Sequence, residues 1–295
     1  MIKHAIEFSA KYLLLLLSFV LFILNANAHE EPTKTLKEKE DKIKKEKQIQ
    51  KSKIKTTIVY KLVYDNDTLS PVKHKVFRMG YDKNGSFSFI EAYEKDSLTE
   101  KDEYTYSING DMISENDFAL DNKIIEKNVF IFDKDGRLIS GISKNKNDSL
   151  TGYFKIIQNS DKKSLEFLSY ATSDSLKYKL VYNYTGDFDS NDYIEALKYD
   201  AKGKLTMKVE KEYDTKSQQT RKTIFDDQGK RLYSFLYEYD SKGNNINITK
   251  KHADGSMDWK DIYVYDKNGN CNRLKRYDKN NTLKMQLVYE FDFYK

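Results

Sequence analysis

The sequence predicts an all-β protein, an antiparallel hairpin-repeat meander that forms a curved, spiral or two-layered sheet. Three observations predict it. A turn motif, in which an aromatic residue is followed by Asp, two variable residues and Gly, recurs with a period of 26 residues. Between the turns, apolar and polar residues alternate as in strands with one dry and one wet face. The two prolines, Pro32 and Pro71, both lie outside the expected strands.

Residues 1–28 have the pattern of a secretory signal peptide. Lys3 and Lys11 precede the apolar run 12–24, and small residues at 26 and 28 mark a cleavage site after Ala28. A membrane-spanning helix needs roughly 18 apolar residues, more than this run supplies. We therefore expect an exported protein, in the periplasm, on the outer surface or outside the cell, with no transmembrane helix after cleavage.

Residues 29–55 form a Lys- and Glu-rich stretch without an aromatic side chain. Such a stretch cannot bury enough apolar surface to offset its ordering entropy. We interpret it as a tether, disordered or a frayed helix, with a basic arm for anionic lipid or glycan as the alternative. The domain that follows, residues 56–295, carries 39 basic and 39 acidic side chains and is formally neutral. A nucleic-acid partner is therefore not expected, because binding phosphates requires a net basic face.

The repeat is most regular between residues 199 and 281. The full motif begins at Tyr81, Phe132, Tyr199, Phe225, Tyr239 and Tyr265. A second turn sequence, Asp-Thr-Leu or Asp-Ser-Leu, begins at Asp67, Asp96, Asp148 and Asp174, in between the first. In the first motif, Asp accepts a hydrogen bond from the backbone two residues on, and Gly takes a left-handed conformation.

Alternation between the turns gives strands of eight or nine residues. In one strand Leu205, Met207 and Val209 face one way, and the last strand repeats this with apolar residues at Leu283, Met285, Leu287, Tyr289, Phe291 and Phe293. About eighteen strands at ~4.8 Å spacing would make a flat ribbon ~85 Å wide. Such a ribbon would expose its apolar face, so it must curl, spiral or fold into two layers.

With its aromatic-Asp-x-x-Gly turns followed by a basic residue and Leu, as in 132–138, the chain resembles the YD repeats of Rhs-type proteins of bacterial envelopes and secretion systems. The resemblance covers residues 56–295 loosely and 199–281 best. It implies a curved or spiral sheet in a bacterial extracytoplasmic protein, and carbohydrate binding is one function connected with such repeats. Two features depart from the family: the period is longer than usual, and the Asp-Ser-Leu turn is not part of it.

Aromatic pairs two residues apart precede several turns, at 104/106, 130/132, 182/184, 237/239 and 263/265. Such ladders fill a core or line a sugar-binding face. Around Tyr182 the same face carries Tyr178 and Leu180, so we interpret these ladders as core. Cys271, the single cysteine, allows no internal disulfide and is expected to pack inside a strand.

One segment has the spacing of a calcium loop. Asp187, Asp189 and Asn191 place oxygen ligands at alternating positions. Asp192 stands where the EF-hand pattern requires Gly, and Lys198 where it requires Glu, so we prefer an ordinary acidic hairpin loop and keep calcium as the alternative. No other cofactor is expected.

The sequence contains no catalytic motif. The histidines left after processing, His29, His74 and His252, lack metal-ligand spacing, and no nucleophile elbow or phosphate loop occurs. We therefore expect a non-enzymatic binding or scaffold module at the cell envelope, with a glycan or protein ligand. Two alternatives stay open: an outer-membrane β-barrel, suggested by the strand count and the aromatic last strand, and an envelope hydrolase with a carboxylate pair that sequence does not reveal.

Overall fold

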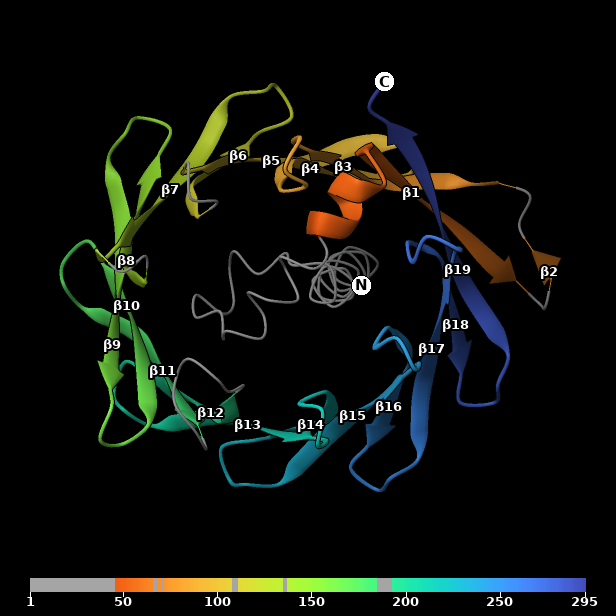
Figure 1. Ribbon diagram of the computed structural model, residues 1–295. Helices are drawn as coiled ribbons and strands as arrows, with labels where there is room; N and C mark the ends of the chain where they lie inside the picture. Colours follow the sequence, from red (N-terminus) through yellow and green to blue (C-terminus); the bar gives the residue numbers. More distant parts are fainter. Residues whose placement is uncertain (1–45, 66–67, 70–71, 108–110, 135–136, 185–192) are drawn as a thin grey trace, which may run out of the picture.

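The computed structural model describes residues 46–65, 68–69, 72–107, 111–134, 137–184 and 193–295 (Figure 1). A short helix over residues 46–51 is followed by strands in an unbroken meander. The strands are β1 (Ile54–Asp65), β2 (Thr68–Leu69), β3 (His74–Tyr81), β4 (Phe87–Glu94), β5 (Ser97–Tyr106), β6 (Met112–Phe118), β7 (Ile124–Phe132), β8 (Leu138–Asn145), β9 (Leu150–Asn159), β10 (Ser164–Ala171), β11 (Leu176–Tyr184), β12 (Tyr193–Asp200), β13 (Leu205–Tyr213), β14 (Gln219–Phe225), β15 (Arg231–Tyr239), β16 (Asn245–His252), β17 (Met257–Tyr265), β18 (Cys271–Asp278) and β19 (Leu283–Phe293).

The meander closes into a β-barrel of 18 strands, with the two-residue β2 paired to the end of β1. Each strand from β3 onward pairs antiparallel with the next, and β1 pairs with both β3 and β19. The closing register joins Ile54 to Phe293 and Val63 to Met285. The predicted antiparallel meander is confirmed, but the predicted open curved, spiral or two-layered sheet is wrong. Closure pairs the backbone groups that β1 and β19 would otherwise leave free at two sheet edges.

Turns of the two predicted sequences share one geometry at 266–270 and 145–149, whereas the turn at Asp96 differs, with both Lys95 (φ 48°) and Asp96 (φ 66°) left-handed. In the turn 266–270, the Asp266 carboxylate accepts hydrogen bonds from the backbone N–H groups of Asn268 (2.8 Å) and Asn270 (2.9 Å), and Gly269 has a φ of 84°. In the turn 145–149, the Asn145 side chain accepts from the N–H groups of residues 147 and 149, and Asp148 has a φ of 61°. The Asp of the second sequence thus occupies the left-handed position that Gly occupies in the first, since Asp tolerates this conformation.

Tyrosines at the strand ends fasten each hairpin to the preceding one. The hydroxyl of Tyr213 donates to the backbone oxygen of Tyr193 (3.0 Å), that of Tyr239 to Gln219 (2.9 Å) and that of Tyr265 to Asn245 (2.7 Å). The three donors are 26 residues apart, as is the repeat. These three tyrosines, of which Tyr239 and Tyr265 begin a turn motif, therefore tie neighbouring strands together at one rim of the barrel.

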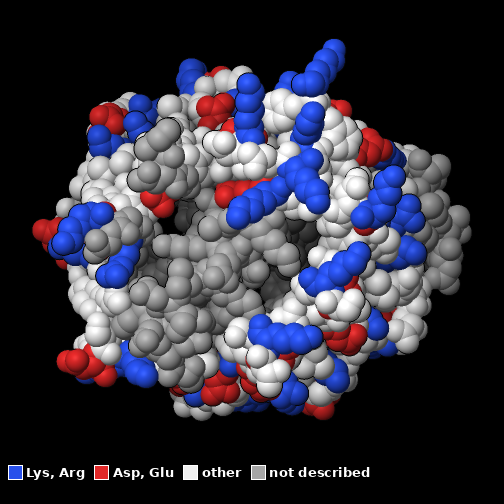
Figure 2. Space-filling model, in the orientation of Figure 1, with Lys and Arg blue, Asp and Glu red and all other residues white. Residues whose placement is uncertain are grey.

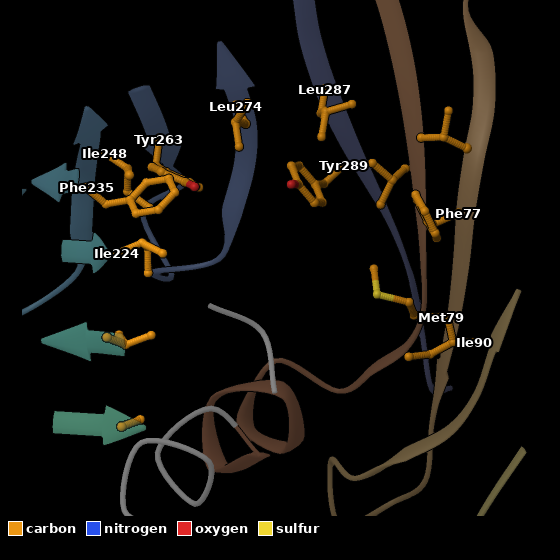
Figure 3. Packing of buried hydrophobic residues seen from close by; sticks show 14 of the residues in the cluster. Phe77, Met79, Ile90, Ile224, Phe235, Ile248, Tyr263, Leu274, Leu287 and Tyr289 are labelled. Atoms are coloured by element: carbon orange, nitrogen blue, oxygen red, sulfur yellow. The ribbon is translucent and has the colours of Figure 1, made fainter. Parts of the chain in front are cut away.

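The buried face of the sheet is the inner face. The helix 46–51 lies within the ring (Figure 1), and its Ile49 packs against the cluster of buried hydrophobic residues. Figure 3 shows this cluster around the enclosed space, with Tyr263 of β17, Leu287 and Tyr289 of β19, and Met79 of β3. Tyr182 (2% exposed), Tyr184 and Tyr263 are buried there, which confirms the core interpretation for these tyrosines. The alternation predicted for β13 and β19 is confirmed in the middle of each strand, at Met207 and Val209 and at alternate residues from 285 to 291, whereas Phe293 at the end of β19 is 54% exposed.

Residues 46–53 lie inside the stretch for which the sequence predicts a tether. Ile54, the last but one residue of that stretch, already begins β1 and is buried. Cys271 packs against the buried cluster, as expected, and is half-buried. No helix among the described residues is long and apolar enough to cross a membrane.

Candidate functional site

The inner wall of the barrel is the face that carries the buried cluster, and it also carries charged residues in fixed register. On β13 the apolar series Leu205, Met207, Val209 continues into Lys211. Lys211 lies directly opposite Lys222 of β14, on the same face as the buried pair Val209 and Ile224. The same alternation places four further cations on the inner face, because each of them follows a buried residue of its own strand by two positions. These are Lys198 of β12, Lys250 of β16, Arg276 of β18 and Lys61 of β1. We call these six residues the basic sector.

Aromatic rings support the cations of the basic sector. The ammonium of Lys211 lies 3.5 Å from the centroid of the Tyr193 ring, and that of Lys198 lies 5.3 Å from the Tyr178 ring. Lys250 and Arg276 make the same kind of contact with Tyr233 (4.9 Å) and Trp259 (4.0 Å). A cation is attracted to the negative face of an aromatic ring, more strongly where water is excluded. The rings hold these side chains against the wall.

Arg276 and Lys250 of the basic sector contact carboxylates. Arg276 donates to both oxygens of Asp261, at 2.7 and 2.5 Å, and Asp261 is fully buried. Burial raises the pKa of Asp261, while the bidentate contact with Arg276 acts in the opposite direction. The pKa of Lys61 is lowered by burial and by the nearby Arg276 charge. Lys250 pairs with Asp258 at 2.9 Å.

The opposite part of the inner wall is acidic. Asp102 of β5, Glu115 and Asp117 of β6, and Glu126 of β7 share the inner face, because Glu115 lies opposite both Tyr104 and Asn128, and Asp117 opposite Asp102. We call these four residues the acidic sector. Glu115 is 1% exposed. Burial, together with the negative charge of Asp117, raises its pKa to about 8.

The two sectors face each other across the barrel. β6 and β15 lie halfway round the ring from each other (Figure 1). Although Asp261 lies among the cations, an excess of basic residues on one side and of acidic residues on the other produces an electric field across the enclosed space, and low-dielectric walls focus such a field. The interior can therefore orient a ligand that carries a charge at one end.

The outer wall is charged along the middle of the strands. Lys208 of β13 contacts Glu195 of β12 (3.1 Å) and Glu210 (2.8 Å), and Lys101 contacts Glu103 on β5 (2.7 Å). Further outer pairs are Arg78–Glu91 and Lys179–Glu166. Figure 2 shows acidic and basic side chains interspersed around the periphery of the ring. Exposed pairs of this kind add little stability, but they indicate contact with water.

The helix 46–51 is attached to one mouth of the barrel by two turns. Ser86 of the β3–β4 turn donates to the Glu46 carboxylate (2.8 Å), and Gln48 donates to the backbone oxygen of Asn268 in the β17–β18 turn. A Cβ atom at Gly85 would lie 2.3 Å from the Glu46 backbone oxygen, so only Gly permits this approach. Next to this contact, the Tyr294 hydroxyl donates to the backbone oxygen of Tyr81 (2.6 Å).

The residues singled out by sequence have different outcomes. Asp187, Asp189 and Asn191 lie outside the described residues. In the part of the chain that the structure describes, no group of three His, Cys, Asp or Glu side chains is arranged to hold a metal ion. His74 pairs with Asp96 at 3.0 Å and His252 approaches Asp258 at 3.8 Å, both at the surface. The structure instead places Lys211 directly opposite Lys222 on the inner wall. Continuing the alternation of β13 past Val209 would have placed Lys211 on the apolar face.

Comparison with known proteins leaves this chain without a family. No family model matches it, and no curated protein matches it. Among solved structures, a porin-like protein from Bacteroides uniformis ATCC 8492 aligns at 9% identity over 82% of this chain and 97% of that one, with a TM-score of 0.30. A porin-like protein from Bacteroides vulgatus ATCC 8482 aligns at 11% identity over 80% of this chain and 98% of that one, with a TM-score of 0.27.

The TcdB2-TccC3-TEV structure aligns at 13% identity and a TM-score of 0.28. The alignment covers 77% of this chain, which spans only 14% of the length of that one. These scores are too low to establish a common fold with any of the three proteins.

Proposed function

We propose that this chain is an exported cell-envelope protein whose barrel faces water on the outside and binds an apolar ligand inside, without catalysing a reaction. The observation that carries the proposal is the arrangement of the two walls. Apolar and aromatic residues gather on the inner wall, and paired charges lie along the outer wall. A membrane-embedded barrel has the reverse arrangement, with an apolar band about 25 Å tall on the outside.

The width of the barrel supports a ligand inside. Small barrels of about eight strands are filled by their own side chains, whereas barrels of about sixteen to eighteen strands enclose a channel. A ring of 18 strands is by this rule wide enough to enclose a channel. An apolar wall around such a space favours an apolar occupant, because burying that wall removes it from water.

A pair of neighbouring residues on β11 tests the proposal. Leu180 packs against the buried cluster, and the adjacent Val181 is on the outer face, opposite Glu166. We expect the wild-type chain to stay in solution without detergent and to bind a neutral naphthylamine dye. Val181→Lys should preserve solubility, dye binding and thermal midpoint, whereas Leu180→Lys should lose dye binding and unfold several degrees earlier.

A second candidate function is an outer-membrane β-barrel. It is favoured by the closure of the ring and by the aromatic end of β19, with Tyr289, Phe291 and Phe293. For this candidate the same two variants have the opposite outcome. Val181→Lys would place a charge in lipid at a cost of roughly 2–4 kcal/mol at mid-depth and would block membrane assembly. Dependence on detergent and a heat-modifiable gel mobility would favour this candidate over the first.

A further inference from the structure

We infer that the apolar ligand carries a neutral carbonyl group, whose oxygen accepts hydrogen bonds from the hydroxyls of Tyr263 and Tyr289 on the inner wall of β17–β19. This inference rests on the proposed function and deepens it by naming the ligand class. It depends on three features of the wall: two hydroxyls that point toward one another, their burial without a partner among the described residues, and the apolar surface around them.

The two tyrosines lie two strands apart on the inner face. Tyr263 of β17 is directly opposite Leu274 of β18, and Leu274 is directly opposite Leu287 of β19. Tyr289 follows Leu287 by two residues, so two strand spacings, roughly 10 Å, separate the strands of the tyrosines. Figure 3 shows their side chains extending toward each other across this interval. Burial, the Asp261 charge and the nearby Tyr289 hydroxyl raise the pKa of Tyr263, so the two hydroxyls are within electrostatic range.

Neither hydroxyl has a hydrogen-bond partner in the part of the chain that the structure describes. Tyr263 is 5% exposed and its oxygen is buried without a partner, and Tyr289, 6% exposed, makes no hydrogen bond there. The neighbouring tyrosines differ, because Tyr265 donates to a backbone oxygen of β16 and Tyr81 is hydrogen-bonded to Thr57. A buried donor without an acceptor is destabilising. A ligand that supplies the acceptor therefore gains this free energy when it binds.

The chemistry of the two hydroxyls favours a neutral acceptor. A carbonyl oxygen has two lone pairs, so a single oxygen can accept from both tyrosines. An alcohol would have to use one tyrosine oxygen as its own acceptor and would leave the proton of that tyrosine unpaired. An anionic group is disfavoured, because the Asp261 charge acts on Tyr263 more strongly than the opposite charge of its partner Arg276.

The wall around the hydroxyls is apolar and would contact the rest of the ligand. Leu274 and Leu287 lie between the tyrosines, and Ile248 of β16 and Phe235 of β15 extend the same buried cluster away from them (Figure 3). These side chains offer no hydrogen-bond partners, so polar groups elsewhere on the ligand would be left unsatisfied. The ligand class is therefore an apolar compound with one carbonyl group, a ketone or an ester.

A dimethylaminonaphthalene dye with a propionyl group, and its analogue with propyl in place of propionyl, test the inference on the full chain. The double variant Tyr263→Phe, Tyr289→Phe should bind the propionyl dye about tenfold more weakly than the wild-type chain does, because it lacks the two donors. It should bind the propyl analogue unchanged. The emission of the propionyl dye, which moves to longer wavelength when the carbonyl accepts hydrogen bonds, should lie at shorter wavelength in this variant. Tyr199→Phe, the same change on the outer wall, should leave both dyes unaffected.

The ligand-free double variant distinguishes a binding role from a structural one. Because it removes buried donors without partners, its thermal midpoint should equal or exceed that of the wild-type chain. A midpoint several degrees lower, together with wild-type affinity for both dyes, would show that the hydroxyls serve the fold and would contradict the inference.

The remaining outcomes separate this inference from the proposed function. If both dyes bind the wild-type chain and the double variant loses no affinity for the propionyl dye, the carbonyl assignment is wrong while an apolar interior site stands. If both dyes and the neutral naphthylamine dye fail to bind the wild-type chain, the proposed function fails with it. Should the double variant not fold, the carbonyl stretching frequency of the propionyl dye bound to the wild-type chain decides. We expect a frequency lowered by hydrogen bonding, and the value found in hydrocarbon would overturn the inference.

Discussion

The inner and outer walls of this barrel are made from the same strands, yet they use charged residues differently. On the outer wall, Lys208 meets Glu195 and Glu210 in partly exposed pairs. On the inner wall, Lys211, only three residues further along β13, lies on an aromatic ring, and the four residues of the acidic sector are gathered on the far side of the ring of strands. Charge on the outside keeps the surface hydrated. Charge on the inside is segregated, and it is costly to bury unless something offsets it.

The largest expected difference between the walls is at β17. Asp261→Ala leaves Arg276 buried without its partner, which should lower the free energy of unfolding by roughly 3–5 kcal/mol. Lys260→Ala, at the neighbouring outer position, should change it by less than about 0.5 kcal/mol. Chemical denaturation of both variants measures the two values. If both variants lowered the free energy of unfolding equally, the inner and outer walls would not differ at β17.

A pH dependence should distinguish the acidic sector from the outer acids. The pKa of Glu115 is raised to about 8 in the folded chain, well above the usual value, so the folded state holds a proton that the unfolded state has lost. The contribution of Glu115 therefore falls as pH rises from the usual carboxylate range toward 8, and the loss is on the order of a few kcal/mol.

Glu115→Gln should abolish that dependence. The variant should match the wild-type chain at pH 5 and exceed its stability at pH 9, as thermal unfolding across the pH range would measure. Glu103→Gln on the outer wall of β5 is the matched control and should keep the wild-type pH profile. A Glu115→Gln variant that still loses stability between these pH values would contradict the assignment.

A smaller effect is expected at the rim. Tyr265→Phe removes the hydroxyl that donates to Asn245 and leaves that part-buried oxygen without this donor, which should cost about 1 kcal/mol. Tyr199→Phe, on the outer wall, should be close to neutral. Hydrogen exchange of the β16–β17 amides would locate the loss, and protection unchanged in Tyr265→Phe would show that the tyrosine acts through packing alone.

The sequence predicts the local structure of this chain well because its turns obey simple stereochemistry. Gly269 lies at the turn position that requires a left-handed backbone, and Asp266 lies where a side-chain acceptor is required. The alternation of Leu205, Met207 and Val209 gives their strand its buried face. It was not predicted from the sequence that the turn at 145–149 has the same geometry as the turn at 266–270. There Asp148, the first residue of its turn sequence, takes the left-handed conformation that Gly takes at the end of the other. Closure was expected only in the alternative of an outer-membrane β-barrel, because the pairing of Ile54 with Phe293, at opposite ends of the domain, has no local signal.

The candidate site was missed for a different reason. No lysine was considered from the sequence as part of an inner-wall site, although the alternation of β13 past Val209 places Lys211 on the buried face. The parity of a position within its strand decides its face, and only the register between β13 and β14 shows that Lys211 lies opposite Lys222. The acidic residues 187–192, which attracted attention by their spacing, lie outside the described residues.

The orientation of the two walls can be measured directly with nitroxide spin labels. In a Cys271→Ser background, labels placed singly at Val181 and Ser140 report on the outer wall, and a label at Leu180 reports on the inner wall. With the chain mixed with lipid vesicles, we expect both outer labels to collide freely with a water-soluble nickel chelate and the inner label to be shielded from it. Outer labels that are instead shielded from the chelate and accessible to oxygen would place the outer wall in lipid and contradict the proposed water-facing barrel.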